Sequence, residues 1–153
     1  MLIRKAVEDD YEAVLRIMCQ VQDMHVEWRP DIYKSNKELI SREGYLAALN
    51  GDAFYVAEKE GKVVGVLGLQ YRHIETPSHV TRDVIFIDGM AVDEQFRGIG
   101  IAHAFFDKVK EIARERHADA IELQVNARNK KAYEMYSKYG FTEKSITMEL
   151  RGW

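Results

Sequence analysis

The chain has 153 residues, of which 46% are hydrophobic and 31% charged, the composition of a globular protein rather than of a disordered one. Its formal net charge of −3 gives no footprint for nucleic acid, because a polyanion binds where positive charge gathers. No apolar run is long enough to cross a membrane and no signal-peptide core opens the chain. We therefore expect a cytoplasmic protein with neither a membrane nor a nucleic-acid partner.

The first third of the chain carries the signals of one strand and two helices. Residues 2–6 have the pattern of a short strand. A capping-box spacing begins at Asp9 and again at Ser35, which predicts the starts of two helices, the second of them ending at residues 50–52. The polar and aromatic segment between these helices, residues 25–30, has no clear periodicity. Connections of this kind often line a binding site.

Three β-rich runs are predicted in the middle of the chain. Residues 53–59 and 62–71 are joined at Gly61, where glycine allows the positive φ of a hairpin turn, so we expect an antiparallel pair. We interpret residues 73–82 as a loop. Residues 84–92 are an almost continuous apolar run, which predicts a central strand.

Helices and strands are predicted to alternate in the last third of the chain. Residues 100–116 form its best amphipathic helix, residues 121–125 alternate as a strand, and residues 129–139 predict a helix closed by glycine. Alternating apolar residues from 146 to 150 predict a final strand. The expected order is β-α-α-β-β-β-α-β-α-β, an α/β fold with a mixed sheet. No linker interrupts residues 1–153, so we expect a single domain.

The junction between residues 84–92 and the helix at 100–116 has the features of an anion site. The first turn of a helix leaves N–H groups unpaired, and the helix dipole adds positive potential. Gly98, Gly100 and Ala102 would let phosphate oxygens approach those N–H groups. Glycine before a helix also serves ordinary tight turns, so this pattern alone leaves both interpretations open. It matches neither the P-loop nor the Rossmann fingerprint.

Two spaced motifs make the chain resemble a known family. The run Arg97–Ala102 resembles the R/Q-x-x-G-x-G/A signature of the GNAT superfamily of N-acetyltransferases. A second family pattern, N-x-x-A-x-x-x-Y-x-x-x-G-F, is matched by Asn129, Ala132, Tyr136, Gly140 and Phe141. With the element order, the resemblance covers nearly the whole chain. It implies a strongly twisted mixed sheet flanked by helices, and direct transfer of an acetyl group from acetyl-CoA to a primary amine in a ternary complex.

The resemblance also implies which residues hold acetyl-CoA. Gly89 would kink the strand at residues 84–92 and open a slot for the pantetheine arm, which Asn129 would hydrogen-bond. The strand backbone facing the arm would be that of Met90, Ala91 and Val92. The pyrophosphate would lie over Arg97, Gly98, Ile99, Gly100, Ile101 and Ala102. Glu94 stands where the family often has proline, which puts the rigidity of this loop in question.

Tyr136 and Asp88 are the catalytic candidates that the resemblance implies. A phenol with a pKa of about 10 is protonated at neutral pH, so Tyr136 can protonate the departing thiolate. An alkylamine arrives mostly as a cation, and Asp88 would take its proton; a solvated or ion-paired aspartate is the equal alternative. Five further residues would border the acceptor pocket or simply pack at an interface: His25, Trp28, Tyr33, Tyr71 and His73.

Several alternatives stay open at this point. The acceptor could be a small amine, an amino acid or a protein N-terminus, and Glu27 hints weakly at a cationic one. A CoA-binding sensor or scaffold without activity is the main alternative function. The five histidines have no metal-ligand spacing, so no metal is expected, and Cys19 lies in a helical apolar pattern typical of a core residue. A homodimer remains open as the assembly.

Overall fold

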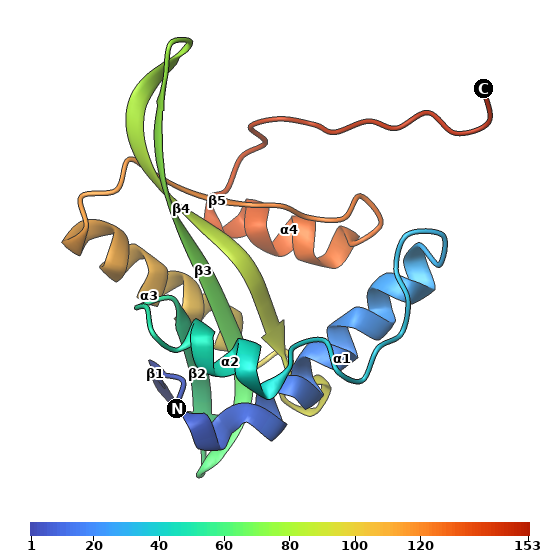
Figure 1. Cartoon of the computed structure of the whole chain (residues 1–153), viewed down its shortest axis with the longest axis vertical. Helices are drawn as coiled ribbons and strands as arrows, with labels where there is room; N and C mark the ends of the chain where they lie inside the picture. The colour runs from blue at the N-terminus through green and yellow to red at the C-terminus, as the bar shows by residue number, and fades with distance from the viewer.

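The computed structural model describes residues 1–153 and contains a five-stranded sheet with helices on both faces (Figure 1). Its elements follow the order β1 (Leu2–Lys5), α1 (Tyr11–Trp28), α2 (Arg42–Ala48), β2 (Phe54–Lys59), β3 (Lys62–Thr76), β4 (His79–Val92), α3 (Ile101–Glu115), β5 (Ala120–Leu123) and α4 (Lys130–Tyr139). The strands lie in sequence order, antiparallel except for the parallel pair β4–β5. The expected α/β fold with a mixed sheet is confirmed.

Each face of the sheet has its own core. On one face, Val14 and Ile17 of α1 and Tyr45 of α2 are fully buried against strand residues such as Val56 and Val66. On the other face, α3 buries its apolar stripe, which packs against β2, β3 and β4 and consists of Ile101, Phe105, Phe106, Val109 and Ile112. The sheet is therefore the middle layer of three.

A glycine in β3 brings α3 close to the sheet. A Cβ atom at Gly65 would lie 3.0 Å from side-chain atoms of both Ile101 and Phe105. These two residues belong to the first turns of α3, so glycine here lets the beginning of the helix sit directly on β3. The position of the α3 N-terminus is fixed in this way.

Three of the helix boundaries differ from those expected. Asp9, the expected cap of the first helix, lies in a short 3-10 turn, and α1 begins at Tyr11. The first helix continues to Trp28, so His25 lies on α1 and not in an irregular connection. The second helix begins after Ser41, whose Oγ accepts a hydrogen bond from the Gly44 N–H at 3.0 Å. The expected cap, Ser35, instead directs its hydroxyl to Asp23 at 3.3 Å. A capping spacing predicts a helix only where the hydroxyl reaches the backbone.

Residues 73–82 were expected to form a loop, and this expectation was wrong. They continue β3 and β4 into a long hairpin, here called the arm, which projects from the sheet (Figure 1). Its strands pair as far as Thr76 and His79. Most side chains of the arm are exposed on both sides, so no apolar alternation marks it in the sequence. Cross-strand pairs such as His73–Asp83, 2.7 Å apart, accompany the backbone pairing instead.

The predicted final strand does not form within the chain. Residues 142–153, here called the tail, are extended without a strand partner and cross toward the end of α1 (Figure 1). There Glu149 pairs with Arg29, and Arg151 pairs with Asp31. The alternation of apolar side chains that predicted a strand is present. A strand also needs a sheet edge with which its backbone can pair, and the tail leads away from its own sheet.

Candidate active site

The two halves of β4 have different surroundings. Residues 84–87 pair with β3 on one side and with β5 on the other, the last pair being Ile87 with Leu123. β5 ends there, and the rest of β4, from Asp88 to Val92, has a strand partner only in β3. The open edge of β4 is the slot that an extended ligand could enter, because its backbone groups on that side lack a strand to pair with.

An extra residue in β4 marks the beginning of this slot. Gly89 pairs with Gly68, whereas Ile87 pairs with Leu69, so Asp88 is a bulge between them. Both Ile87 and Met90 pack against the core on the α3 face, although an odd separation would place them on opposite faces of a regular strand. The bulge therefore restores the alternation, and it lies at Asp88, directly before Gly89, where the kink was expected.

Beyond the bulge, the side chains divide between the two cores. Met90 and Val92 pack on the α3 face, and Ala91 is buried on the α1 face. Their side chains thus leave the plane of the sheet, and what remains at the open edge is backbone. This arrangement is compatible with the expected pairing of these three residues with a pantetheine arm.

The loop after β4 presents two glycines in left-handed conformations. Gly98 has φ of +79° and Gly100 has φ of +92°, a region that favours glycine. A Cβ atom at either position would meet nothing within 4 Å, so open space lies above both. Gly100 is the N-cap of α3 and offers no side chain to the unpaired N–H groups of the first turn. These groups are free to bind an anion.

The remaining residues of this loop differ in what they can contribute. Ile99 is about half exposed, whereas Ile101 is 2% exposed and belongs to the core. Ile101 could therefore contact a ligand only through its backbone N–H. The Nε of Arg97 donates to the Val92 carbonyl at 3.2 Å, which ties the loop back to the end of β4.

Two side chains of α1 hold the beginning of the loop, and sequence reasoning missed both. The Nη1 of Arg16 lies 2.6 Å from the buried carboxylate of Asp93. Burial alone would raise the pKa of Asp93, but hydrogen bonds from Arg16 and from the Gln95 N–H outweigh it and keep that pKa below its usual range. The only sequence signal was an aspartate placed directly after a strand, where it caps the following turn.

The second contact, between Gln20 of α1 and Glu94, restrains the loop at the position where the family often has proline. The N–H of Glu94 donates to Oε1 of Gln20 at 2.9 Å. A proline at this position has no N–H, so this hydrogen bond is open to Glu94 and not to the residue common in the family. The loop is restrained by α1 instead of by a proline ring.

Tyr136 lies in an aromatic cluster between α3 and α4. Its ring meets Phe106 and Phe141 edge-on, with centroids 5.8 Å and 5.9 Å away. Burial of the side chain raises its pKa. The hydroxyl makes no hydrogen bond within the protein, and no buried polar side-chain atom is left without a partner, so this hydroxyl reaches the surface. The side chain thus offers an accessible proton on an otherwise enclosed ring.

The other two candidates have simpler surroundings. Asn129 caps α4, and its side-chain oxygen accepts from the Ala132 N–H at 3.2 Å. Its amide NH₂ group is the part that remains available for a ligand. Asp88 is exposed at the bulge and forms no ion pair, which leaves the solvated form as the alternative to a catalytic role.

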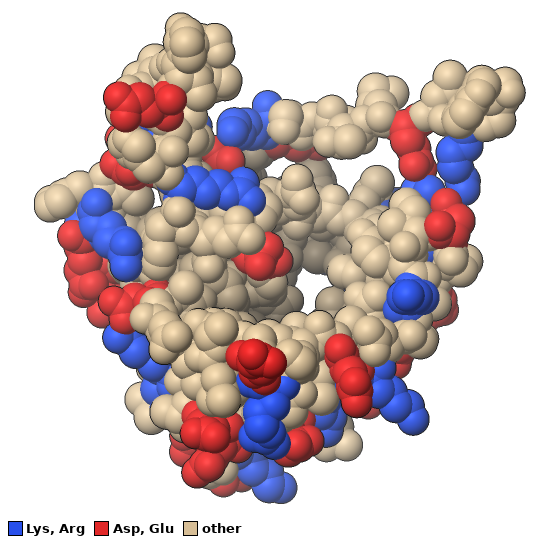
Figure 2. All heavy atoms as spheres, in the orientation of Figure 1, with Lys and Arg blue, Asp and Glu red and all other residues tan.

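The five residues expected at the acceptor pocket fall into two groups. His25 lies 5.7 Å from Trp28 and 4.9 Å from Tyr33 between ring centroids, and these three rings form a cluster at the end of α1. Arg128, in the connection between β5 and α4, donates to the Trp28 carbonyl. The cluster therefore lies beside the segment that leads to Tyr136. Figure 2 shows that the molecule is hollowed at the centre of the view of Figure 1.

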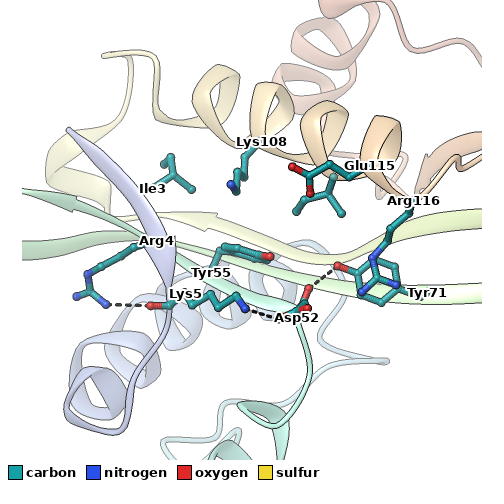
Figure 3. Close-up of a pocket in the computed structure, with 10 residues that line it drawn as sticks. Ile3, Arg4, Lys5, Asp52, Tyr55, Tyr71, Lys108, Glu115 and Arg116 are labelled. Carbon is teal, nitrogen blue, oxygen red and sulfur yellow. Dashed lines mark hydrogen bonds and ion pairs between the residues drawn. The ribbon is translucent and has the colours of Figure 1, made fainter.

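Tyr71 and His73 lie apart from that cluster. Tyr71 stacks under Arg116 at the end of α3, 3.6 Å from ring centroid to guanidinium carbon, and His73 pairs with Asp83 and Glu75 in the arm. Tyr71 lines a cavity of about 260 Å³ between β1, β2 and the last turns of α3. Figure 3 shows its side chain at the wall of this cavity. Because the glycine loop lies at the first turn of α3, this cavity is at the far end of the helix.

No group of three or more histidine, cysteine, aspartate or glutamate side chains is arranged to hold a metal ion. A search for membrane spans likewise finds no helix that combines the length and the apolar character needed to cross a bilayer.

Comparison with known proteins agrees with the geometry. The model of the acetyltransferase (GNAT) family matches residues 19–141. An uncharacterized N-acetyltransferase of Methanocaldococcus jannaschii is 31% identical over 151 residues, which are 99% of this chain and 63% of that relative. The chain thus spans less than two thirds of the length of this relative.

Solved structures share the fold over the full length. A mutant of the BH1408 protein from Bacillus halodurans is 32% identical and has a TM-score of 0.92 over 100% of both chains. An aminoglycoside N-acetyltransferase in complex with CoA has a TM-score of 0.71 at 18% identity, over 99% of this chain and 98% of that one. With a family model that spans most of the sequence, the chain belongs to the acetyltransferase (GNAT) family.

Proposed function

We propose that the protein is an N-acetyltransferase that passes an acetyl group from acetyl-CoA directly to a primary amine. The observation that carries this proposal is the open edge of β4, from Asp88 to Val92, leading into the glycine loop at the α3 N-terminus. Bound acetyl-CoA would supply an acetyl group activated as a thioester. No residue of the chain needs to carry the acetyl group in between.

The residues present fit such a ligand. An extended arm can hydrogen-bond along the open edge of Met90, Ala91 and Val92, as a further strand would. The open space above Gly98 and Gly100, together with the free N–H groups of the first turn of α3, suits a pyrophosphate. The Asn129 amide NH₂ group is free to hydrogen-bond a carbonyl of the arm. Side chains larger than hydrogen at the two glycines would project into the same space.

Tyr136 and Asp88 would move the protons. The raised pKa of Tyr136 keeps its phenol protonated at neutral pH, so its hydroxyl can donate a proton to the departing sulfur. The Asp88 carboxylate, at the bulge where the slot begins, would accept a proton from the incoming amine directly or through water. N–H groups at the open edge of β4 would polarise the reacting carbonyl.

The acceptor would enter from the end of α1. The cluster of His25, Trp28 and Tyr33 lies there, beside the connection that leads to α4. Flat rings suit the apolar part of an amine-bearing molecule, and the exposed carboxylate of Glu27 adds negative charge nearby. A small amine, an amino acid and a protein N-terminus remain the three acceptor classes to test.

The direct test measures thiol release from acetyl-CoA with a panel containing a diamine, free amino acids and short peptides. We expect release with at least one class, and mass spectrometry should show the acetylated amine. The same amines blocked by prior acetylation are the matched control and should release no thiol. CoA binding by calorimetry without release for any class would contradict the proposal and favour a CoA-binding sensor.

A further inference from the structure

The cavity at the far end of α3 lies apart from the proposed acetyl-CoA site. Charged side chains surround it, and part of its wall is apolar or aromatic (Figure 3). The α3 residues that line it, from Lys108 to Arg116, lie about 12 to 24 Å along the helix from Gly100. A small molecule bound here does not reach the glycine loop. The apolar part of the wall consists of Ile3, Tyr55, Tyr71 and Ile112.

Tyr55 presents an unpaired hydroxyl to this cavity. The residue is 5% exposed, and its ring belongs to the core below α3. The hydroxyl forms no hydrogen bond within the protein, and no buried polar side-chain atom is left without a partner, so the hydroxyl opens on the cavity. Figure 3 shows it directed toward Asp52. Whatever fills the cavity, water or a ligand, must supply its hydrogen-bond partner.

Two of the four cationic side chains around the cavity are already neutralised. Arg4 pairs with Asp10 and with Glu58, and neither of these carboxylates lines the cavity. Lys5 pairs with Asp52, which does line it. These pairs therefore add no net charge for a ligand to meet.

The other two cations, Lys108 and Arg116, are available to a ligand. The Arg116 guanidinium lies over the Tyr71 ring and forms no ion pair, so its N–H groups remain free. The Lys108 ammonium pairs with Glu111 at 3.3 Å, but the Glu111 side chain is 55% exposed and such a surface pair is weak. Among the lining carboxylates, only that of the exposed Glu115 forms no ion pair. The free groups thus carry one more positive than negative charge.

The size and the charge of the cavity suit a small organic monoanion. Its volume of about 260 Å³ is that of roughly nine water molecules. One excess positive charge matches a monoanion, whereas a phosphate dianion would bring two negative charges close to Glu115 and Asp52. The apolar part of the wall is stabilised only by a ligand with an apolar body, because such a body removes apolar surface from water.

We propose that this cavity is a second ligand site, which binds a small monocarboxylate with an apolar body. Arg116 and the Tyr55 hydroxyl hydrogen-bond the carboxylate, and Lys108 adds positive charge. Because Lys108 and Arg116 are about two helical turns apart, they flank the ligand and do not meet at one of its atoms. The apolar body lies against Ile112 and the Tyr55 ring. This site does not depend on whether the protein transfers acetyl groups.

NMR titration of the intact, isotope-labelled protein tests the site with benzoate, benzamide and inorganic phosphate. Benzamide has the shape of benzoate without its charge, and phosphate has negative charge without an apolar body. We expect benzoate to shift the amide resonances of Ile3, Tyr55 and Arg116 with a dissociation constant of about 1 mM or below. The other two probes should bind at least roughly 10-fold more weakly. Equal affinity for benzamide or for phosphate would overturn the proposal.

Two variants test the individual groups. Arg116→Gln removes the charge and nearly keeps the length of the side chain, so the dissociation constant of benzoate should rise about 10-fold or more. Tyr55→Phe removes the hydroxyl and keeps the ring in the core, and the rise should be about 2- to 10-fold. Arg114→Gln is the matched control, because Arg114 is an exposed arginine of the same helix end that does not line the cavity. Circular dichroism verifies that each variant is folded.

Three further outcomes would contradict the site. Shifts confined to Gly98–Ile101 would place benzoate at the N-terminus of α3. An absence of shifts at benzoate concentrations about 20-fold above the expected dissociation constant would show that the cavity binds no such ligand. Arg116→Gln that binds benzoate as tightly as Arg114→Gln does would remove the charge from the argument. No readout uses CoA or acetyl transfer, so failure here is distinguishable from failure of the proposed function.

Discussion

The two halves of β4 belong to one continuous strand but differ in strand pairing and in exposure. Residues 84–87 are paired on both edges and buried, whereas Asp88–Val92 are paired on one edge and partly exposed. The difference comes from a short neighbour, since β5 ends at Leu123, and from one extra residue at Asp88. An open strand edge can therefore be made by omitting a few residues from the adjacent strand, without disturbing the core that holds the rest.

We expect the largest effect from a substitution in the glycine loop that follows the open half of β4. Gly100→Val should abolish CoA binding, because the substitution strains a residue at φ of +92° and fills the space above the α3 N-terminus. Calorimetry measures the loss. Gly51→Val is the control, since Gly51 also has open space around a would-be Cβ but a φ outside the left-handed region. A folded Gly100→Val protein with wild-type CoA affinity would show that the loop is an ordinary turn.

Tyr136→Phe should lower kcat by about 100- to 10,000-fold with little change in CoA affinity. The change removes a proton donor but keeps the ring between Phe106 and Phe141. Steady-state kinetics with a good acceptor measures it, and Tyr133→Phe, an exposed tyrosine of the same helix, is the matched control. Wild-type turnover by Tyr136→Phe would make Tyr136 a packing residue.

Substitutions in residues 84–87, the half of β4 that is paired on both edges, should lower the stability of the fold and not the affinity for CoA. Ile85 is 1% exposed, so Ile85→Ala should lower the free energy of unfolding by about 2–5 kcal/mol and leave CoA affinity unchanged in the folded fraction. Met90→Ala, in the open half, should cost less because Met90 is only partly buried. Urea titrations of both variants compare the halves directly. Equal losses of unfolding free energy in the two variants would mean that the unpaired edge of β4 does not affect local packing.

Asp88→Asn should change the shape of the pH profile. The amide cannot accept a proton, so the loss in kcat/KM should be about 10- to 100-fold at low pH and should shrink as more of the amine is neutral in solution. A profile parallel to wild type at every pH would exclude the role of base. A raised KM with kcat preserved would instead assign Asp88 to binding a cationic acceptor.

The smallest effect concerns the contact between α1 and the loop. The folded-state pKa of Asp93 lies below its ordinary value, so its stabilising contribution is fully present above about pH 4 and is lost as pH falls through the folded pKa. The contribution of such a charged hydrogen bond is about 1–3 kcal/mol. Urea midpoints between pH 6 and pH 3 should fall less steeply in Asp93→Asn than in wild type. Identical slopes would mean that the carboxyl group of Asp93 has the same pKa in the folded and unfolded states.

How well the sequence predicted each region depended on whether local pattern or distant contacts decide its structure. The apolar run of β4 and the glycines at 98 and 100 are local signals, and both led to the right elements. The arm escaped prediction because its exposed side chains carry no alternation. Ser35 was expected to cap the second helix, but its hydroxyl contacts Asp23 and α2 is capped by Ser41. The hydrogen bond from Glu94 to Gln20 joins residues 74 positions apart, and nothing local announces it.

The length of α1 has a consequence for how such an enzyme can change its substrate. Arg16 and Gln20 hold the loop from one part of the helix, and His25 and Trp28, which we propose border the acceptor, lie up to about 18 Å further along it. If that proposal holds, substitutions at the far end should alter acceptor selectivity while the loop keeps its geometry. The helix would then act as a rigid spacer between the donor and acceptor ends of the proposed site, and a library restricted to residues 25, 28 and 33 would test new acceptors with an unchanged acetyl donor.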